Sequence, residues 1–192
     1  MQTTEQLHAP ARHDLHNSGR ATTPPAEISG EDFAHAFRHY PGGVAIITAE
    51  SSNGPVAITA TSVVSVSAVP PLFAFSISHR ASTAEGIRKA HSYVVHFLGS
   101  DQLEIAQLCA TSGVDRFADT QLWARLPTGE PYFPSASAWV VGTRIDQLDA
   151  EAASLILVRA THSKVAPNAD DAPPLVYVNR GWHHLGEHSQ LA

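Results

Sequence analysis

The chain has little of what several large classes of protein require. It has one cysteine, Cys109, in 192 residues, which excludes an internal disulfide framework and indicates a reducing compartment. Charged residues make up 16%, and the net charge is -6 with histidine neutral, so the sequence predicts neither a nucleic-acid surface nor an anionic-membrane surface. No apolar run approaches the roughly 20 residues that cross a bilayer.

Motifs for several common activities are also missing. There is no Gly-x-Gly-x-x-Gly, no phosphate-loop Gly-Lys-Ser/Thr and no Gly-x-Ser-x-Gly, so nucleotide-binding and hydrolase functions have no motif support. Residues 1–8 contain neither a basic region nor an apolar core, so we expect no secretory signal and a cytoplasmic protein. Twelve histidines are present, but no ligand set has a zinc-like spacing, and we predict no metal site.

The rest of the composition is typical of one folded domain with an N-terminal extension. Hydrophobic residues make up 43%, which is too high for global disorder. Residues 1–28 contain sparse apolar side chains among Pro, Thr and His, so we expect a flexible arm. Residues 29–192 are long enough to form one domain with its own core.

Short apolar runs separated by turn signals predict mostly β structure with short helices. Ser29, followed by Phe33 and Phe37, predicts a capped amphipathic helix. The turn 52–55 (Ser-Asn-Gly-Pro) predicts an antiparallel hairpin between a strand at 44–48 and a strand from 56 onward. Further strands are expected at 72–78, 93–98, 139–145 and 155–160, with 175–178 as the last strand and an acidic link at 146–151. Helices are expected at 84–90, capped by Thr83, and after Ser100, which would cap the second helix. This pattern favours an antiparallel barrel or sandwich.

The stretch 56–75 carries a regular row of small hydroxyl groups. Read as one extended segment with period 2, it places Thr59, Thr61, Ser65 and Ser67 on one face, interrupted only by Val63, because side chains alternate across a strand. Such a row leaves room for a flat ligand and can form hydrogen bonds with it. A half-buried strand whose polar face meets water has the same pattern, so both interpretations stay open.

Two loops that contain arginine are candidate anion sites. The first offers the forked cation of Arg80 with the hydroxyls of Ser82 and Thr83 beside a helix start, which suits a phosphate. The alternative is a capped helix with a solvated arginine. The second loop offers Arg116, for which the alternative is an exposed pair with Asp115.

Five segments together resemble the flavin-reductase-like family, whose fold is the FMN-binding split barrel. They are residues 37–49, 54–72, 78–83, 114–117 and 174–177, and the Thr-x-Thr-Ser-x-x-Ser-x-Ser…Pro-Pro-Leu block is the most specific. The resemblance covers about residues 32–184. It implies a mostly β, antiparallel split β-barrel that forms a homodimer. Many members are reductase components of two-component flavin-dependent monooxygenases, which use NADH or NADPH to reduce FMN or FAD.

The resemblance also implies which residues bind the flavin. The segment that would line the isoalloxazine ring and ribityl chain contains Thr59, Thr61, Ser62, Val63, Ser65, Val66 and Ser67. The segment that would hold the ribityl hydroxyls and the phosphate contains Ser78, His79, Arg80, Ser82 and Thr83, and Arg116 would close on the phosphate. Hydride transfer needs no protein acid or base at the reacting carbon, only nicotinamide stacked on the flavin, so no catalytic side chain is assigned.

The sequence departs from the family where the nicotinamide is expected. Reductases of this family usually carry Gly-Asp-His before the penultimate strand, whereas this chain has Glu151-Ala152-Ala153. His183 is a candidate substitute. We expect an NAD(P)H-dependent flavin reductase that supplies a partner monooxygenase. The alternatives are a flavin carrier or a flavoenzyme that acts on another substrate, and a cofactor-free dimeric β-barrel module.

Overall fold

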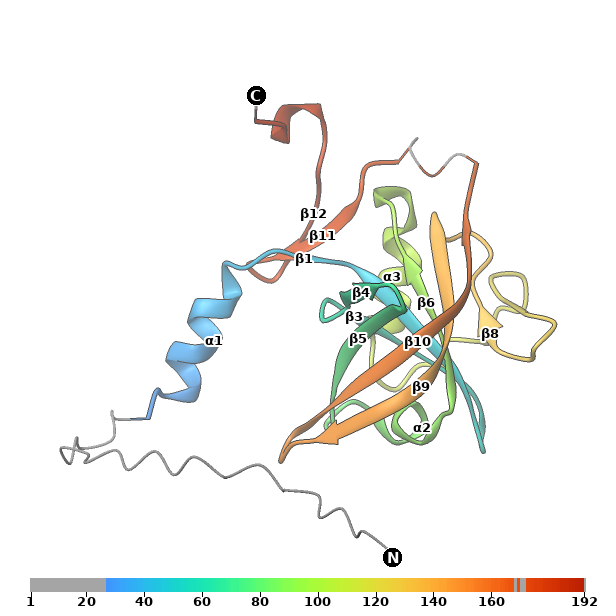
Figure 1. Cartoon of the computed structure of the whole chain (residues 1–192). Helices are drawn as coiled ribbons and strands as arrows, with labels where there is room; N and C mark the ends of the chain where they lie inside the picture. Colours follow the sequence, from blue (N-terminus) through green and yellow to red (C-terminus); the bar gives the residue numbers. More distant parts are fainter. Residues whose placement is uncertain (1–26, 168, 170–171, 192) are drawn as a thin grey trace, which may run out of the picture.

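The computed structural model describes residues 27–167, 169 and 172–191 (Figure 1). Nearly all of the arm expected at residues 1–28 therefore lies outside the described residues. The helices are α1 (Gly30–Arg38), α2 (Ala84–Lys89), η1 (Ser100–Gln102), α3 (Leu103–Ala110) and η2 (Glu187–Ser189). The strands are β1 (Gly42–Gly43), β2 (Ala45–Ser51), β3 (Gly54–Ala60), β4 (Val64–Ala68), β5 (Pro71–Ser78), β6 (Ser92–Phe97), β7 (Ala124–Arg125), β8 (Pro131–Tyr132), β9 (Ala138–Asp149), β10 (Ala153–Val165), β11 (Leu175–Val178) and β12 (Gly181–His184).

Seven antiparallel strands form the main sheet, in the order β3-β2-β6-β9-β10-β5-β4. Its two edge strands, β3 and β4, are consecutive in the chain and are joined by residues 61–63 alone. Seven strands in a flat sheet would place these edges about 29 Å apart, whereas the connection can span at most about 14 Å. The sheet must therefore curl into a barrel, as Figure 1 shows, and the expected split-barrel architecture is confirmed.

The strand β2 is buried on both faces, which explains its continuous apolar sequence. Ala45 and Ile47 point into the barrel and belong to a core cluster that also contains Phe75. Val44, just before the strand, and Ile46 belong to a second cluster that includes residues of α3. A strand covered on both faces has no polar alternation, so β2 forms the wall between the barrel interior and the layer around α3.

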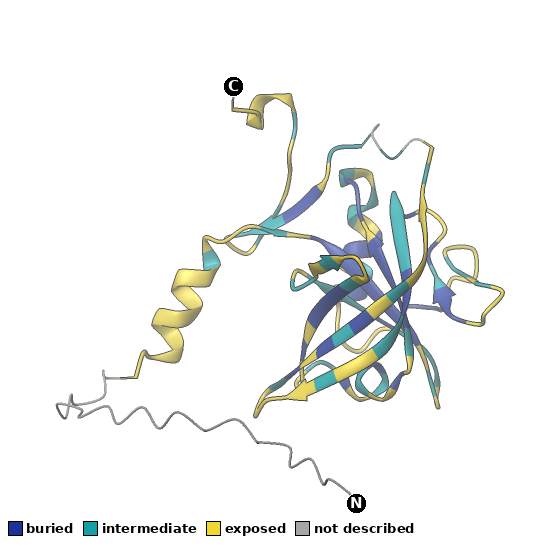
Figure 2. Cartoon of the chain, in the orientation of Figure 1, coloured by how far each residue is buried: buried dark blue, intermediate teal, exposed yellow. Residues whose placement is uncertain are grey.

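The helix α1 stands apart from the barrel. Its start is confirmed, because Ser29 Oγ accepts a hydrogen bond from Asp32 N at 3.0 Å. None of its residues is buried, and the side chains of Phe33 and Phe37 remain 53% and 59% exposed. Figure 2 shows this helix exposed along nearly its whole length. The apolar face of α1 therefore makes little contact with the described part of its own chain.

The hairpin of β2 and β3 is confirmed, with Ser51 opposite Gly54 across the expected turn. Most other expected strands are present as well, but the bounds of β9 and β10 were wrong. β9 continues to Asp149 and β10 begins at Ala153. Most of the expected acidic link is therefore paired strand. Polar side chains suit the solvent face of such an extension, and charge alone therefore does not mark its end.

Two further expectations were wrong. The strand β11 is not the last, because β12 pairs with it across a turn in which Asn179 and Arg180 have positive φ values of 51° and 62°. Ser100 does not cap the following helix. Ser100 is the first residue of η1, whose N-cap is Gly99, with its N–H donating to Gln102 Oε1 at 2.9 Å. The N-cap of α3 is Gln102. Within the described ranges, no helix is long and apolar enough to cross a membrane.

Candidate functional site

The sequence predicted one extended segment for the stretch of hydroxyl residues. The structure instead has two strands with a bend between them. β3 ends at Ala60 and β4 begins at Val64, because residues 61–63 carry the chain from one sheet edge to the other. Ser62 fixes this bend onto β5: its Oγ donates to Ser76 O at 2.8 Å and accepts from Ser76 N at 3.2 Å. The alternation of period 2 therefore does not extend from Thr59 to Ser67.

The two halves of the hydroxyl row line different cavities. Thr59 and Thr61 border a hollow of about 210 Å³ that also contains Tyr177 and Trp182. Thr59 Oγ1 donates to Ala106 O of α3 at 2.6 Å, so this hydroxyl is already used within the fold. Thr61 is exposed and is the residue of this half that remains accessible to a ligand.

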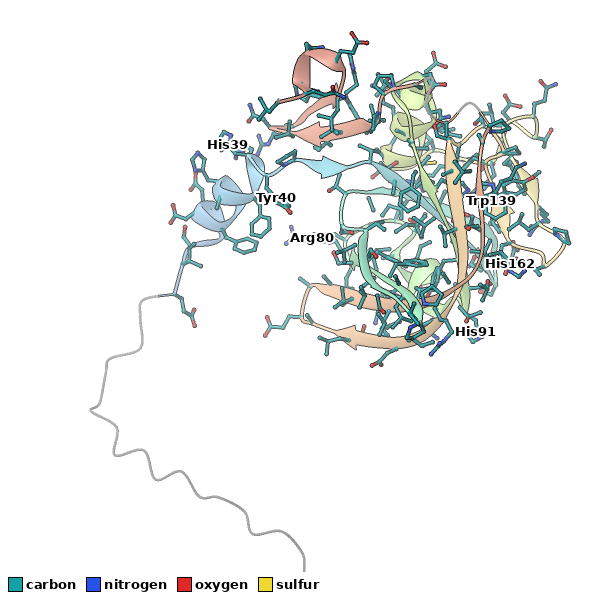
Figure 3. The ribbon with its side chains drawn as sticks, turned by 45° about the horizontal axis from the view of Figure 1, so that its top comes forward. His39, Tyr40, Arg80, His91, Trp139 and His162 are labelled. Atoms are coloured by element: carbon teal, nitrogen blue, oxygen red, sulfur yellow. The ribbon has the colours of Figure 1, made fainter. Side chains whose placement is uncertain are left out.

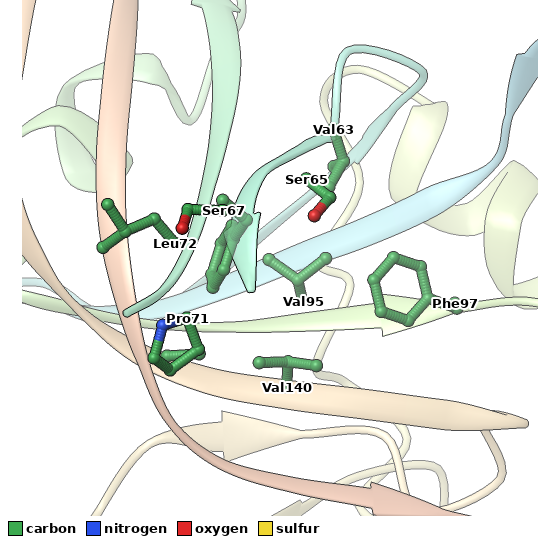
Figure 4. Close-up of a pocket in the computed structure, with 10 residues that line it drawn as sticks. Val63, Ser65, Ser67, Pro71, Leu72, Val95, Phe97 and Val140 are labelled. Atoms are coloured by element: carbon green, nitrogen blue, oxygen red, sulfur yellow. The ribbon is translucent and has the colours of Figure 1, made fainter. Parts of the chain in front are cut away.

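Ser65 and Ser67 line a second cavity of about 290 Å³ at the edge of the barrel (Figure 4). Its walls are otherwise largely apolar and include Val63, Leu72, Phe73, Val95, Phe97 and Val140. The register of β4 against β5 shifts between Ser65 and Ser67, and the intervening Val66 is 53% exposed. Two hydroxyls on an apolar surface suit a flat heterocycle that stacks on the wall and forms hydrogen bonds at its rim.

The loop from Ser78 to Thr83 leaves β5 and leads into α2. Ser78 Oγ accepts from Arg80 N at 3.3 Å, and the side chain of Arg80 is exposed. Figure 3 shows Arg80 at the edge of the barrel on the side of α1. Ser82 and Thr83 line a hollow of about 200 Å³ next to the turn between β2 and β3.

Thr83 is the N-cap residue of α2, as expected, but its side chain makes no cap hydrogen bond. Thr83 Oγ1 is instead buried, and within the described part of the chain it has no hydrogen-bond partner. A buried hydroxyl without a partner is unfavourable. The other donors of this loop, the guanidinium of Arg80 and the hydroxyls of Ser78 and Ser82, are of the kind that a phosphate or ribityl chain requires.

Arg116 is placed differently from Arg80. Its side chain is buried, with Nε donating to Cys109 O at 3.1 Å and Nη2 donating to Thr111 O at 2.7 Å. These carbonyls belong to the C-terminal end of α3, where helices leave acceptors unsatisfied. The alternative of an exposed pair with Asp115 was wrong. The structure gives Arg116 a role in stabilising α3, and its bonded edge is not available to a phosphate.

The single cysteine does not form part of a reactive site. Cys109 is fully buried, and burial raises the pKa of its thiol to about 12. The thiolate, which is the nucleophilic form, is therefore scarce at neutral pH. Among the described residues, no group of three or more His, Cys, Asp and Glu side chains lies close enough together to hold a metal.

The residues expected near a nicotinamide are separated in the structure. Ala153 pairs with Ser78 across β10 and β5, so the position where the family pattern has His adjoins the loop 78–83. His183 is exposed on β12, opposite Val176. It thus lies in the three-stranded sheet of β1, β11 and β12 rather than beside Ala153 in the main sheet.

Sequence reasoning missed two features of this region. Tyr177 and Trp182 line the cavity of Thr61, and β12, which carries Trp182, was not predicted. Ser154 is fully buried and forms hydrogen bonds with His79, Arg88 and Asp149. A lone serine in an apolar strand gives no sequence signal for such a role, because its partners come from three other segments.

Comparison with known sequences relates this chain to flavin reductases. The sequence profile of the "Flavin reductase like domain" matches residues 37–186. The chain is 40% identical to an NADH:FMN oxidoreductase of Rhodococcus erythropolis over 153 residues, which cover 78% of this chain and 79% of the relative. It is 27% identical to the reductase component of a 4-nitrophenol 4-monooxygenase/4-nitrocatechol 2-monooxygenase of Rhodococcus opacus, with 80% of each chain covered.

The fold comparison agrees with the sequence comparison. The structure superposes on the crystal structure of a flavin reductase domain protein from Arthrobacter sp. FB24 with a TM-score of 0.76 and 30% sequence identity. The match covers 81% of this chain and 95% of that chain. All five resembling segments fall inside or overlap the matched range. The chain belongs to the flavin reductase like family.

Proposed function

We infer that the chain is an NAD(P)H-dependent flavin reductase that reduces FMN or FAD. The observation that carries this inference is the match to the family over residues 37–186, which includes both the cavity of Ser65 and Ser67 and the loop 78–83. The 40% identity to an NADH:FMN oxidoreductase supports NADH and FMN as the substrates.

The residues of the chain bind and orient the substrates in this proposal. When bound, the flavin supplies the ring that accepts a hydride from NAD(P)H. Ser65 and Ser67 provide hydrogen bonds at the rim of the ring, and apolar residues such as Val95 exclude water from one face. Arg80 and the hydroxyls of Ser78, Ser82 and Thr83 hold the ribityl chain and phosphate.

The direct experiment is steady-state oxidation of NADH and NADPH by the purified protein with added FMN. We expect oxidation well above a buffer control, because both substrates are then held in reacting geometry. A protein that binds FMN but oxidises neither nucleotide would instead be a flavin carrier or a flavoenzyme acting on another substrate. The Ala152-Ala153 sequence favours that second function, since the family pattern has a histidine there.

The variant Ala153→His separates the two functions further. If the chain is a reductase that turns over slowly because it lacks this imidazole, the variant gains turnover with NADH, whereas a carrier gains none.

His183→Ala tests whether His183 replaces the missing family histidine. A rise in KM for NADH with unchanged FMN affinity supports a nicotinamide contact at His183. Unchanged kinetics would remove His183 from the site.

We further propose that the protein is a cytoplasmic homodimer that supplies reduced flavin to a monooxygenase. The exposed Phe33 and Phe37 of α1 support a second copy, because a nine-residue helix is marginal without packing. The named relative from Rhodococcus opacus supports the oxygenase partner. Light scattering tests the dimer, which a monomeric mass would contradict. Product formation by an added oxygenase tests the transfer, and its failure with an active reductase would contradict the partner.

A further inference from the structure

Ser154 is the centre of a hydrogen-bond network that joins three parts of the chain. Its Oγ lies 2.9 Å from Arg88 Nε of α2, 2.9 Å from His79 Nε2 and 2.5 Å from Asp149 Oδ1 of β9. Asp149 also accepts from Gln147 Nε2 at 2.8 Å and lies 3.4 Å from Arg88 Nη2. Ser154 is itself fully buried.

The chemistry of these groups fixes the direction of each hydrogen bond. The hydrogen bond from Ser154, and secondly that from Gln147, lowers the pKa of Asp149, so this carboxylate is ionised at neutral pH and only accepts. Arg88 can only donate. Ser154 therefore accepts from Arg88 and donates to Asp149, and the remaining contact requires His79 to donate its Nε2–H to Ser154. One tautomer of His79 thus satisfies the whole network.

This arrangement is the reverse of a hydrolytic Ser-His-Asp triad. A nucleophilic serine donates its proton to histidine, which the carboxylate orients from the other side. Here the serine donates a hydrogen bond directly to the carboxylate and accepts one from histidine. Its oxygen is also inaccessible to a substrate. The network therefore has a positional role and no hydrolytic one.

The same network fixes the start of the loop 78–83. The backbone N–H of His79 donates to Ala152 O at 2.9 Å, and its ring is held by Ser154, so both its main chain and its side chain are tied to the tip of the β9–β10 hairpin. Arg80 follows directly, and its N–H is bound to Ser78 Oγ. The direction in which the Arg80 side chain leaves the barrel is thus set by the hairpin.

We propose that Ser154 is a positioning residue for flavin binding: through His79 it holds the loop 78–83 in the conformation that presents Arg80 to the phosphate. This inference rests on the proposed function, since it requires that the loop binds the flavin phosphate. Ordering a loop in advance removes an entropic cost from binding. Ser154 therefore raises flavin affinity without taking part in hydride transfer.

The test is FMN titration of the wild type and of Ser154→Ala by quenching of flavin fluorescence, combined with kcat at saturating FMN. We expect Ser154→Ala to raise the Kd for FMN about fivefold or more, while kcat stays within about twofold, because only uniform binding is lost. A purely structural role would lower the melting temperature and leave the Kd of the folded fraction unchanged. That result would overturn the proposal, as would a fall in kcat alone.

Tyr93→Phe is the matched control. The Tyr93 hydroxyl is buried and donates to Ile87 O at 3.1 Å and Ala90 O at 2.9 Å, so its removal weakens the attachment of α2, as Ser154→Ala does. Among the described residues, this hydroxyl forms no hydrogen bond with the loop 78–83. We expect a lower melting temperature with an unchanged Kd for FMN, and an equal rise in Kd would show that any loosening of α2 suffices.

A second variant keeps the proposal testable if Ser154→Ala does not fold. His79→Ala removes the hydrogen bond between His79 and Ser154 by changing the residue that is partly exposed. We expect the same rise in the Kd for FMN. Where both variants fold, the double variant should bind FMN no more weakly than either single variant, because the two residues act as one unit; additive losses would contradict this. If the wild type itself does not bind FMN, the proposed function fails instead.

Discussion

The two loops that contain Arg80 and Arg116 look alike in sequence but differ in structure. Both place an arginine near hydroxyl or acidic residues, and the sequence predicts an anion site in each. Arg116 is buried with two of its nitrogens bound to carbonyls at the end of α3, whereas Arg80 is exposed and follows a backbone that is tied to the hairpin tip. A cation is therefore available to a ligand only if the fold has not already used its donors.

The largest expected effect is the loss of stability on replacing Arg116. Arg116→Ala leaves two carbonyls of the α3 terminus without donors, and hydrogen bonds to charged groups contribute about 1.5–3 kcal/mol. We expect the free energy of unfolding in urea to fall by about 2–3 kcal/mol. The control is Lys89→Ala, which removes an exposed pair with Glu85 and should cost within about 1 kcal/mol. Equal losses in the two variants would contradict the difference between the loops.

Cys109 reports on the same end of α3. Because its thiol is buried and its pKa is raised to about 12, labelling by a thiol reagent at pH 8 requires local opening. Arg116→Ala should accelerate labelling at least about tenfold, since 1.4 kcal/mol of lost stability is a factor of ten in the open population. Arg80→Ala should leave the rate unchanged. An unchanged rate in Arg116→Ala would show that the guanidinium does not hold this helix end.

Replacement of Arg80 should affect binding and not stability. Arg80→Ala removes the charge-assisted donor that we propose for the phosphate, and we expect the Kd for FMN to rise about tenfold, equivalent to about 1.4 kcal/mol. The unfolding free energy should change by no more than about 0.5 kcal/mol, as for other exposed sites. Fluorescence titration and urea unfolding measure the two quantities. A stability loss without a change in Kd would reverse the roles assigned to the arginines.

Arg80→Lys should give the smallest effect. Lysine keeps the charge but loses the planar fork that matches phosphate oxygens. We therefore expect a rise in Kd of about threefold, between the wild type and Arg80→Ala. If lysine binds as weakly as alanine, geometry rather than charge governs the contact. If it binds as tightly as arginine, the guanidinium contributes only its charge.

Local sequence signals predicted the elements whose cause is local. The cap at Ser29, the turn 52–55 and the apolar run of β5 each specify their structure within a few residues, and each is confirmed. The bend at 61–63 was missed because it results from barrel closure, which brings together strands at opposite edges of a seven-stranded sheet. The strand β12 was missed because its pairing depends on a two-residue turn with positive φ at Asn179 and Arg180, which are not glycines.

The candidate site was predictable in its residue types but not in the direction of its side chains. The sequence pattern identified Ser65 and Ser67, which line a cavity, and Arg80, whose side chain is exposed. It also included Thr59 and Ser62, whose hydroxyls bind Ala106 and Ser76 within the fold. Whether a hydroxyl forms a hydrogen bond within the chain or stays accessible to a ligand depends on contacts between distant segments. These contacts exist only once the barrel has closed.

The loop of Arg80 is the site at which we propose that this barrel binds a flavin phosphate. The most direct measurement compares the Kd of the wild type for FMN and for riboflavin, which lacks the phosphate, by fluorescence titration. We predict that riboflavin binds about tenfold more weakly or worse, and that Arg80→Ala removes most of this difference. Equal affinity of the wild type for the two flavins, or no binding of either, would contradict the account.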